Sequence, residues 1–267
     1  MIEVMGILNV TPDSFSDGGQ HNQKEQAVAH ALQMIQEGAT IIDIGGESTR
    51  PGAASVAVQE ELKRVIPVVK ELAKYDVKIS IDTSEPEVIK QAVEAGAHIW
   101  NDVRALTRPN ALETAVELNI PVVLMHMRGE PTTMNQLAHY NNVMQEVLSE
   151  LKEKIKLALE AGVKADNIIV DPGFGFAKNT EQNIELLKQF EQLKVLGYPI
   201  LAGLSRKRFV SEIADDRITG SVIGHLLCVQ KGAQIIRVHD VKATVAALKM
   251  WKAGSPKMPL HVITLEP

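Results

Sequence analysis

The chain has 267 residues, of which 45% are hydrophobic and 23% are charged. Its formal net charge of −5 argues against a general role in binding nucleic acid or membrane surfaces, although a local basic site is compatible with it. No apolar run approaches the roughly 18 residues of a membrane span, and the first residues lack the basic region of a secretion signal. The single cysteine, Cys228, lies in an apolar run and predicts a buried thiol in a reducing compartment. We therefore expect a cytoplasmic protein.

Eight short apolar runs alternate with longer amphipathic segments along the whole chain. The apolar runs are rich in Val, Ile and Leu with little polar alternation, which is typical of parallel strands buried on both faces. These predicted strands span residues 4–8, 40–44, 77–81, 98–100, 121–125, 168–170, 199–202 and 234–238. The predicted helices span residues 23–37, 58–75, 86–95, 111–118, 140–161, 181–196, 206–213 with 220–231, and 241–252.

Local signals mark where several of these helices begin and end. Ser84 and Glu87 have the spacing of a capping box, with Pro86 in the first turn of the helix. Glycines follow the last periodic residue of four helices and predict helix ends in the left-handed conformation. These glycines are Gly38, Gly96, Gly162 and Gly232.

Eight strand-then-helix units in 267 residues match the size of a (β/α)8 TIM barrel, which typically has about 250 residues. A doubly wound sheet, the main alternative for alternating strands and helices, usually has fewer strands. No linker, low-complexity tract or internal repeat divides the sequence. We therefore predict a single α/β barrel domain over residues 1–267.

The sixth predicted strand ends directly at a carboxylate. Asp171 is followed by a turn that contains Gly173 and Gly175, and two aromatic residues, Phe174 and Phe176, lie in the same turn. A carboxylate framed by two rings would suit a flat, amidine-like heterocycle, because the acid accepts two N–H bonds while the rings cover the faces. On this segment alone, an ordinary strand-capping Asp is an equally good interpretation.

Polar residues also follow nearly all of the remaining predicted strands. The connections from helices to strands are short by comparison and carry few polar residues. In barrels of this class the active site is assembled at the carboxyl ends of the strands. We therefore expect a ligand with two ends: acids and amides would read the edge of a heterocycle, and cations would hold a phosphate-type anion. The first group comprises Asp82, Asn101 and Asp171, and the second comprises Arg50, Lys207, Arg237 and His239.

Each of these residues also has a plain structural interpretation. Asp82 and Asn101 could be helix caps. Arg237 and Lys207 could be salt-bridged surface charges, and His239 could be a hydrogen-bonded structural histidine. Because such residues coincide at the ends of so many strands, a shared site is the better explanation.

Other chemistries fit the sequence less well. The glycine pairs lack the spacing of nucleotide-binding loops, and the histidines lack the spacing of zinc ligands. Ser205 is followed by Arg and Lys and does not lie in a nucleophile elbow. Asp82 and Asp171 could form a glycosidase pair, but the predicted rim lacks the aromatic platforms expected for a sugar.

Five segments, which together span strands one to eight, resemble the motifs of dihydropteroate synthase. They are residues 6–19, 45–52, 171–176, 205–207 and 237–239, which read GILNVTPDSFSDGG, GGESTRPG, DPGFGF, SRK and RVH. The resemblance implies a folate-pathway transferase that joins 6-hydroxymethyl-7,8-dihydropterin diphosphate to 4-aminobenzoate, releases diphosphate and requires Mg2+. It also implies that sulfonamides compete with 4-aminobenzoate.

Carried over residue by residue, the resemblance assigns three groups of substrate-binding residues. The pterin would bind Asp82, Asn101, Asp171 and Lys207, beside the apolar Met125 and Val103. The diphosphate would bind Arg237, Val238, His239 and the amide of Asn9, which would also be the Mg2+ ligand. The 4-aminobenzoate would bind Thr49, Arg50, Pro51, Phe176, Ser205 and Lys207.

The resemblance further implies that diphosphate departs ahead of the attack by the amine and leaves positive charge on the pterin methylene. Buried carboxylates would stabilise that charge, and no strong general base is needed because an aromatic amine attacks in its neutral form. The loops 13–19 and 47–54 would fold over the substrates. The expected catalytic residues are Lys207, Arg50, Asp17 and Asp13.

Two rival interpretations share the predicted fold. One is a pterin-binding methyltransferase domain of the corrinoid-dependent type, and the segments 205–207 and 237–239 argue against it. The other is a non-catalytic pterin-binding or regulatory relative, which the presence of Asn9, Lys207 and Arg237 disfavours.

The segment 219–229 is apolar around most of its circumference, which is more than one barrel-facing side requires. Together with the resemblance, this pattern predicts a homodimer that pairs through the late helices. The alternative is a helix that is buried within its own monomer.

Overall fold

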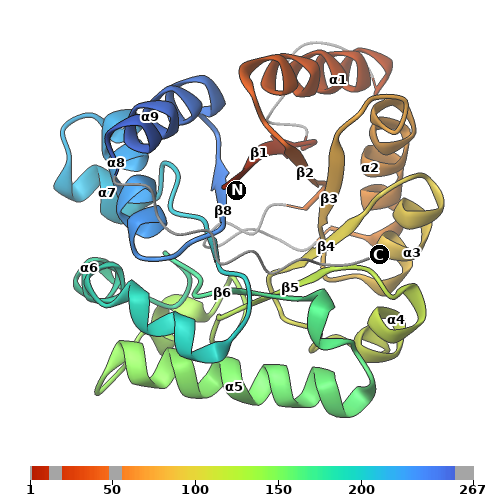
Figure 1. Cartoon of the computed structure of the whole chain (residues 1–267). Helices are drawn as coiled ribbons and strands as arrows, with labels where there is room; N and C mark the ends of the chain where they lie inside the picture. The colour runs from red at the N-terminus through yellow and green to blue at the C-terminus, as the bar shows by residue number, and fades with distance from the viewer. Residues whose placement is uncertain (1, 12–19, 48–55, 256–267) are drawn as a thin grey trace.

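Eight parallel strands form one ring-shaped sheet in the computed structural model (Figure 1), which describes residues 2–11, 20–47 and 56–255. Hydrogen-bonded neighbours follow the order β6-β5-β4-β3-β2-β1-β8-β7. A parallel bridge between Val170 and Ile200 joins β6 to the residue before β7 and completes the ring. The strands are β1 (Glu3–Asn9), β2 (Ile41–Gly45), β3 (Lys78–Asp82), β4 (Ile99–Asp102), β5 (Val122–Met125), β6 (Ile168–Asp171), β7 (Leu201–Ala202) and β8 (Ile235–Val238).

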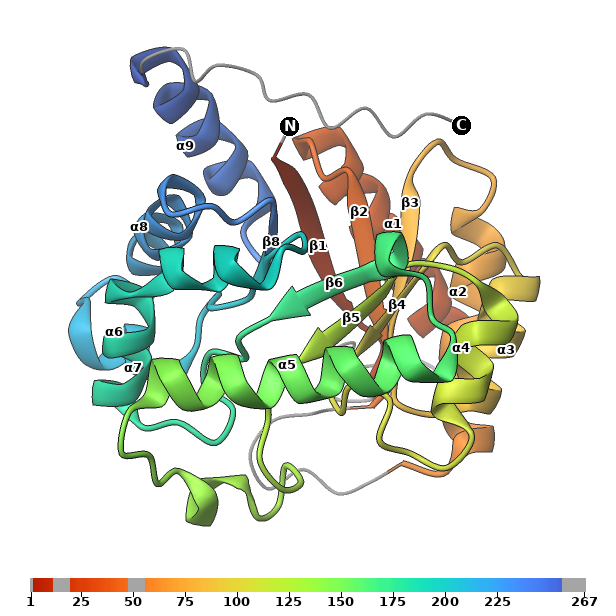
Figure 2. The same ribbon diagram turned by 60° about the horizontal axis from the view of Figure 1, so that its bottom comes forward.

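Helices surround the ring of strands, as Figures 1 and 2 show. The α-helices are α1 (Gln20–Glu37), α2 (Val58–Leu72), α3 (Pro86–Glu94), α4 (Ala111–Leu118), α5 (Val143–Ala161), α6 (Thr180–Lys188), α7 (Arg208–Ile213), α8 (Arg217–Gln230) and α9 (Val241–Gly254). Short 3-10 helices occur at η2 (Met134–Leu137), η3 (Ala165–Asn167) and η4 (Phe190–Leu196). The predicted (β/α)8 barrel is confirmed. None of the helices in the described ranges combines the length and apolarity needed to span a bilayer.

The interior of the barrel has an apolar floor with a polar layer above it. Because side chains alternate along a strand, the residue two positions beyond each floor residue points into the same interior. The floor residues pack on one another and consist of Met5, Ile41, Ile99, Val123, Ile169, Leu201 and Ile235. The polar layer, two positions further along four of these strands, consists of Asp43, Asn101, Asp171 and Arg237. A separate and larger core fills the space between the sheet and the helices.

The predicted capping box at α3 is wrong. The helix begins at Pro86 after Glu85, and no side chain caps it. The Ser84 hydroxyl instead donates to the carboxylate of Asp102 at the end of β4, because both side chains are buried and each supplies the other's partner. The four predicted terminal glycines are confirmed, with φ angles between +107° and +115°.

The predicted helix 181–196 is two elements in the structure. α6 ends at Lys188, and the chain continues as the 3-10 helix η4 from Phe190. Phe190 is fully buried and stacks on Phe174 with 6.0 Å between the ring centroids. This packing ties η4 to the turn that follows β6.

Glu61 on α2 is a buried carboxylate behind the β2–β3 side of the barrel. Its side chain is 1% exposed, and within the described part of the chain its Oε1 atom has no hydrogen-bond partner. Burial raises the pKa of Glu61 to about 7, nearby carboxylates add to this rise, and a hydrogen bond with Thr83 opposes it. The folded protein therefore keeps a proton on Glu61 that the unfolded chain would release at lower pH.

We expect the Glu61→Gln substitution to stabilise the protein at neutral and alkaline pH. Between the ordinary carboxyl pKa of about 4.5 and the folded value of about 7, the folded state binds the extra proton, so wild-type stability falls as pH rises through this window. Above pH 7 the glutamine variant should gain roughly 2–3 kcal/mol over wild type, and the gain should shrink toward zero near pH 4.5. Urea unfolding from pH 5 to 8 measures this, with the exposed Glu94→Gln as the control; parallel pH curves for wild type and Glu61→Gln would contradict it.

Candidate active site

Asp43 lies at the centre of the polar layer and is fully buried. One carboxylate oxygen accepts a hydrogen bond from the Ser80 hydroxyl at 2.6 Å. The other accepts from the Asn101 amide at 3.0 Å and from Nε of Arg237 at 2.6 Å. Asp43 therefore fixes the side chains of β4 and β8 across the mouth of the barrel.

Asp82 shares Arg237 with Asp43 but keeps one oxygen open. Nη2 of Arg237 donates to Oδ2 of Asp82 at 2.6 Å, whereas the buried Oδ1 has no hydrogen-bond partner among the described residues. Burial raises the pKa of Asp82 above its ordinary value, and the positive charge of Arg237 opposes that rise. The helix-cap interpretation of Asp82 is wrong, and its Oδ1 is an acceptor that no described donor uses.

Asp171 is held by the turn that begins two residues later. Its Oδ1 accepts the backbone N–H of Gly173 at 2.7 Å. Gly173 has a φ of +68°, and a Cβ atom there would lie 2.0 Å from the carbonyl oxygen of His126, so only glycine fits. Burial raises the pKa of Asp171, while its hydrogen bond to Gly173 and the nearby lysines favour the ionised form.

Gly203 keeps Asp171 and Arg237 on the same side of the barrel mouth. A Cβ atom on Gly203 would lie 3.7 Å from Cβ of Arg237 and 3.9 Å from Oδ2 of Asp171. The two side chains therefore flank one glycine, as the prediction of a common mouth requires.

Lys207 lies on the ring of Phe176 beside this cluster. Its Nζ atom is 3.9 Å from the ring centroid and donates a hydrogen bond to the carbonyl oxygen of Phe174. The aliphatic part of the side chain needs Gly175, where a Cβ atom would lie 2.6 Å from Cδ of Lys207. Burial lowers the pKa of Lys207 to about 7, and the carboxylate of Asp171 opposes this shift.

Of the two rings predicted beside Asp171, only Phe176 belongs to the mouth. Phe174 is fully buried and stacks on Phe190 and Phe209 at centroid distances of 6.0 and 5.9 Å, so its role in covering a ligand was predicted wrongly. Phe176 instead packs against a small apolar cluster, which includes the two residues predicted as apolar lining. This cluster consists of Val103, Met125, Met127, Met134 and Ala177.

His239 and Ser205 form one unit at the ends of β8 and β7. The Ser205 hydroxyl lies 2.9 Å from Nδ1 of His239 and accepts the backbone N–H of His239 at 3.1 Å. Val238 is 1% exposed, and its side chain belongs to the core between the sheet and the helices. A side-chain contact between Val238 and a ligand is therefore ruled out, which leaves its backbone for the predicted role.

Asn9 lies in one row of aligned residues across the first four strands. The strand register pairs Asn9 with Gly45, Gly45 with Asp82, and Asp82 with Asn101. A Cβ atom on Gly45 would stand 3.8 Å from the Asn9 amide oxygen and 3.5 Å from Cβ of Asp82, so both side chains lie beside this glycine. An amide oxygen is a suitable Mg2+ donor.

The described residues contain no group of three or more His, Cys, Asp or Glu side chains that could hold a metal ion. A single amide oxygen such as that of Asn9 is a hard donor of the kind Mg2+ takes from a protein when phosphate oxygens and water complete its shell.

The predicted residues in the two long loops lie outside the described residues. These are Asp13 and Asp17 after β1, and Thr49, Arg50 and Pro51 after β2. In the opposite direction, Asp43 was not predicted as a site residue. The signal that could have identified it is a single carboxylate inside an otherwise apolar buried strand, since such a charge needs buried partners.

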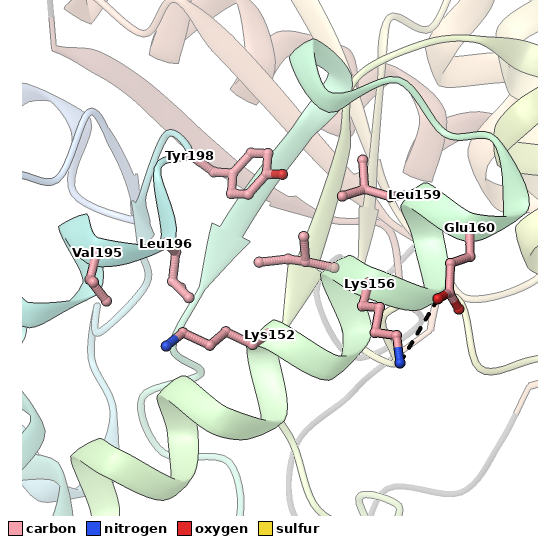
Figure 3. Close-up of a pocket in the computed structure, with 8 residues that line it drawn as sticks. Lys152, Lys156, Leu159, Glu160, Val195, Leu196 and Tyr198 are labelled. Atoms are coloured by element: carbon pink, nitrogen blue, oxygen red, sulfur yellow. Dashed lines mark ion pairs between the residues drawn. The ribbon is translucent and has the colours of Figure 1, made fainter.

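A surface pocket of about 410 Å³ lies away from this site, on the outside of the barrel (Figure 3). It is formed by the second half of α5 and the segment from η4 to Tyr198. The second half of α5 leads through η3 to the start of β6, whereas Asp171 ends that strand. The pocket therefore belongs to the opposite end of the barrel and is not part of the polar layer.

Comparison with known proteins agrees with this geometry. Residues 5–239 match a family model described as "Pterin binding enzyme". Dihydropteroate synthase of Haemophilus influenzae is 50% identical over 256 residues, which cover 94% of this chain and 93% of that protein. The structure of Xanthomonas albilineans dihydropteroate synthase with 4-aminobenzoic acid has a TM-score of 0.90 and 51% identity, covering 96% of this chain and 94% of the other.

A third comparison concerns a drug complex. The structure of Yersinia pestis dihydropteroate synthase with a sulfonamide drug has a TM-score of 0.89 and 48% identity, and the match covers 94% of each chain. These relatives are 48–51% identical over 94–96% of this chain. The chain therefore belongs to the dihydropteroate synthase family.

Proposed function

We infer that the chain joins 6-hydroxymethyl-7,8-dihydropterin diphosphate to 4-aminobenzoate and releases diphosphate. Membership of the dihydropteroate synthase family supports this activity, as does the relative that binds 4-aminobenzoic acid. The single structural observation that carries it is that one barrel mouth brings together Asp82 paired with Arg237, and Asp171 beside Arg237 and near the charge of Lys207. A corrinoid-dependent methyltransferase is set aside because the whole chain matches the synthase family.

The pterin ring would be recognised by acceptors that are already held in place. Asp82 offers its unpartnered Oδ1, while Arg237 fixes its other oxygen. Asp171 offers the oxygen that does not accept from Gly173. Two buried carboxylates facing amide and amino N–H groups give short, charge-assisted hydrogen bonds, and Asn101 adds an amide between them.

The diphosphate would lie against Arg237 and the His239–Ser205 unit. Arg237 already compensates the charges of Asp43 and Asp82, so its attraction for an anion depends on what those carboxylates bind. When pterin N–H groups occupy Asp82, its hold on Arg237 weakens and more of the guanidinium charge is available to the diphosphate. This coupling would favour the substrate that carries both groups over either part alone.

The reaction breaks the bond between the pterin methylene carbon and the diphosphate oxygen, and the bonding electrons leave with diphosphate. The neutral arylamine nitrogen then bonds to the methylene and afterwards loses one proton to solvent. Asp82 and Asp171 would stabilise the positive charge that spreads into the pterin. Lys207, whose Nζ lies over the Phe176 ring, would stand between the pterin and the arylamine.

A Mg2+ ion bound through Asn9 and the diphosphate oxygens would supply charge stabilisation for the leaving group. Support comes from the amide oxygen of Asn9, which lies beside Gly45 and near Asp82 at the end of the strands. Turnover should stop when EDTA removes the metal and return when Mg2+ is added; full turnover in metal-free buffer would contradict the requirement.

The activity itself is tested by diphosphate release. We expect release to require both substrates together, which also separates an enzyme from a non-catalytic pterin-binding relative. A sulfonamide should raise the apparent KM for 4-aminobenzoate and leave the limiting rate unchanged, as competition for one site demands. No diphosphate release from the two substrates with Mg2+, or a sulfonamide without effect at saturating dose, would oppose the proposal.

The chain is also proposed to form a homodimer through its late helices. On α8, Ile218, Ile223 and Leu227 are 41%, 52% and 39% exposed, while Cys228 on another side is buried. Ile223 and Leu227 are four residues apart and share one face of α8, and exposed apolar residues on one helix face favour a partner surface. These exposures do not fit a helix that is completely buried within its own monomer. Light scattering at micromolar concentration should give twice the mass of the 29.2 kDa chain, and Ile223→Asp should reduce it to the monomer mass.

A cytoplasmic location is proposed because the single cysteine is a buried free thiol, as expected in a reducing compartment. Cys228 is buried and unpaired, and burial raises the pKa of its thiol, which suits a protein with no structural disulfide. Cell fractionation with an antibody against the chain would test this location.

A further inference from the structure

Lys178 is a buried lysine just beyond the turn that follows β6. Its side chain lies close to three hydrogen-bond acceptors and is only 8% exposed as a residue. Nζ donates to the carbonyl oxygens of Gly173 and Phe176, both at 3.0 Å, and lies 2.9 Å from Nδ1 of His126. Burial lowers the pKa of Lys178 well below its ordinary value. The amine can donate to the two carbonyls in either protonation state, and when it is protonated His126 accepts its third hydrogen.

The segment between the two carbonyls, here called the 173–176 turn, carries several contacts of the active site. Its first residue donates a backbone N–H to Asp171. Its second supplies the carbonyl that accepts from Lys207, and its last supplies the ring under Lys207. Lys178 therefore binds both ends of the turn that orients Asp171, Phe176 and Lys207.

His126 connects Lys178 to a helix outside the barrel. The ring is fully buried, and its Nε2 atom lies 2.9 Å from Glu150 on α5. Burial lowers the pKa of His126 to about 3, so the ring is neutral near pH 7. A neutral ring that accepts from Lys178 at Nδ1 donates its Nε2–H to Glu150, and Arg128 holds Glu150 in turn.

We propose that Lys178 is a positioning residue for the arylamine side of the site, which it controls by fixing the 173–176 turn against His126. The inference rests on the proposed function, because it assigns Phe176 and Lys207 to the arylamine. Asp171 depends less on Lys178, since the β6 strand itself holds its backbone through the pairing with Met125. Loss of the ammonium should therefore affect 4-aminobenzoate more than the pterin.

The test is Lys178→Met, which keeps the length of the side chain and removes its three donors. We expect KM for 4-aminobenzoate to rise about tenfold or more, because small displacements of a substrate-positioning group have large effects. The affinity for a fluorescent pterin, measured directly by quenching with pterin-6-carboxylate, should change by a smaller factor. Loss of folded protein alone would lower the limiting rate and leave KM unchanged, so the two explanations give different results.

Lys154→Met is the matched control. Lys154 is another mostly enclosed lysine whose ammonium binds one backbone carbonyl, that of Met125, at 2.9 Å without touching the 173–176 turn. We expect this variant to lose stability but to keep the wild-type KM for 4-aminobenzoate. Equal KM changes in the two variants, or a KM within twofold of wild type for Lys178→Met, would overturn the proposal.

Lys178→Gln covers the case in which the methionine variant does not fold. Its amide retains two donors, so the KM increase should be smaller but in the same direction. If Lys178→Gln were also insoluble while Lys154→Met folded, Lys178 would be needed for the fold as a whole, and a role specific to the arylamine site would be rejected. Diphosphate release by wild type, assayed in parallel, separates failure of this inference from failure of the proposed function.

Discussion

Lys207→Ala is expected to lower kcat/KM for 4-aminobenzoate by about a hundredfold or more. The substitution removes the ammonium that lies over the Phe176 ring and donates to the Phe174 carbonyl. It also removes the nearby positive charge that opposes protonation of Asp171. Pterin affinity should therefore fall as well, because a protonated Asp171 is a weaker acceptor for N–H groups.

Steady-state kinetics with each substrate varied, together with direct titration of a fluorescent pterin, would separate these two effects. Arg208→Ala is the matched control, because Arg208 is the next residue along the chain and its side chain is 86% exposed. Its removal should leave both constants near the wild-type values. Normal turnover and normal pterin affinity in Lys207→Ala would show that Lys207 does not link the two substrate sites.

Lys207 also gives the wild-type enzyme an expected pH dependence. Burial places its pKa at about 7, so the ammonium loses its proton as pH rises through that value. The rate at low 4-aminobenzoate concentration should then fall on the alkaline side of neutrality. Bound substrates that carry negative charge should raise this pKa, so the fall should begin at a higher pH when the pterin diphosphate is saturating.

The barrel was predictable from the sequence because the same pattern, a buried apolar strand followed by an amphipathic helix, is repeated eight times. Each strand had to be buried on both faces, which makes its sequence almost entirely apolar, and each helix had one apolar side. The eight repeats then left little choice of architecture. The failures were local: Ser84 has the sequence spacing of a cap, but its bond to Asp102 depends on a strand that lies 18 residues further along the chain.

The site was predictable where a polar residue lies at or next to the end of a strand, and less so where it lies in the middle of one. Asp82 and Asp171 end their strands and Asn101 is the penultimate residue of β4, so their position alone drew attention to them. Asp43 lies in the middle of β2, and its place in the polar layer depends on the closure of the barrel. The prediction that Phe174 covers a ligand was wrong for a related reason, because the sequence does not show which of two neighbouring rings packs into the core.

Asp43→Ala should therefore have a large effect, although Asp43 was not predicted to contact a substrate. The change leaves Nε of Arg237 and the Asn101 amide without their buried acceptor, and it removes the partner of Ser80. Breaking such a buried ion pair should cost about 3 kcal/mol of unfolding free energy. With Asp43 gone, Arg237 is free to turn fully onto Asp82, and the pterin then competes with it for that carboxylate.

The measurements are urea unfolding and KM for the pterin diphosphate, for which we expect an increase of about tenfold or more. Asp43→Asn keeps the shape and one acceptor oxygen for Arg237 and Asn101, so it isolates the loss of charge and should fall between wild type and Asp43→Ala. Ser80→Ala removes only the 2.6 Å bond to the other oxygen and should cost about 1 kcal/mol with little change in KM. If Asp43 orients Arg237 and Asn101 for the substrate, its loss must raise KM for the pterin diphosphate. An Asp43→Ala protein that was less stable but had the wild-type KM would therefore mean that Asp43 supports the barrel without orienting these two residues.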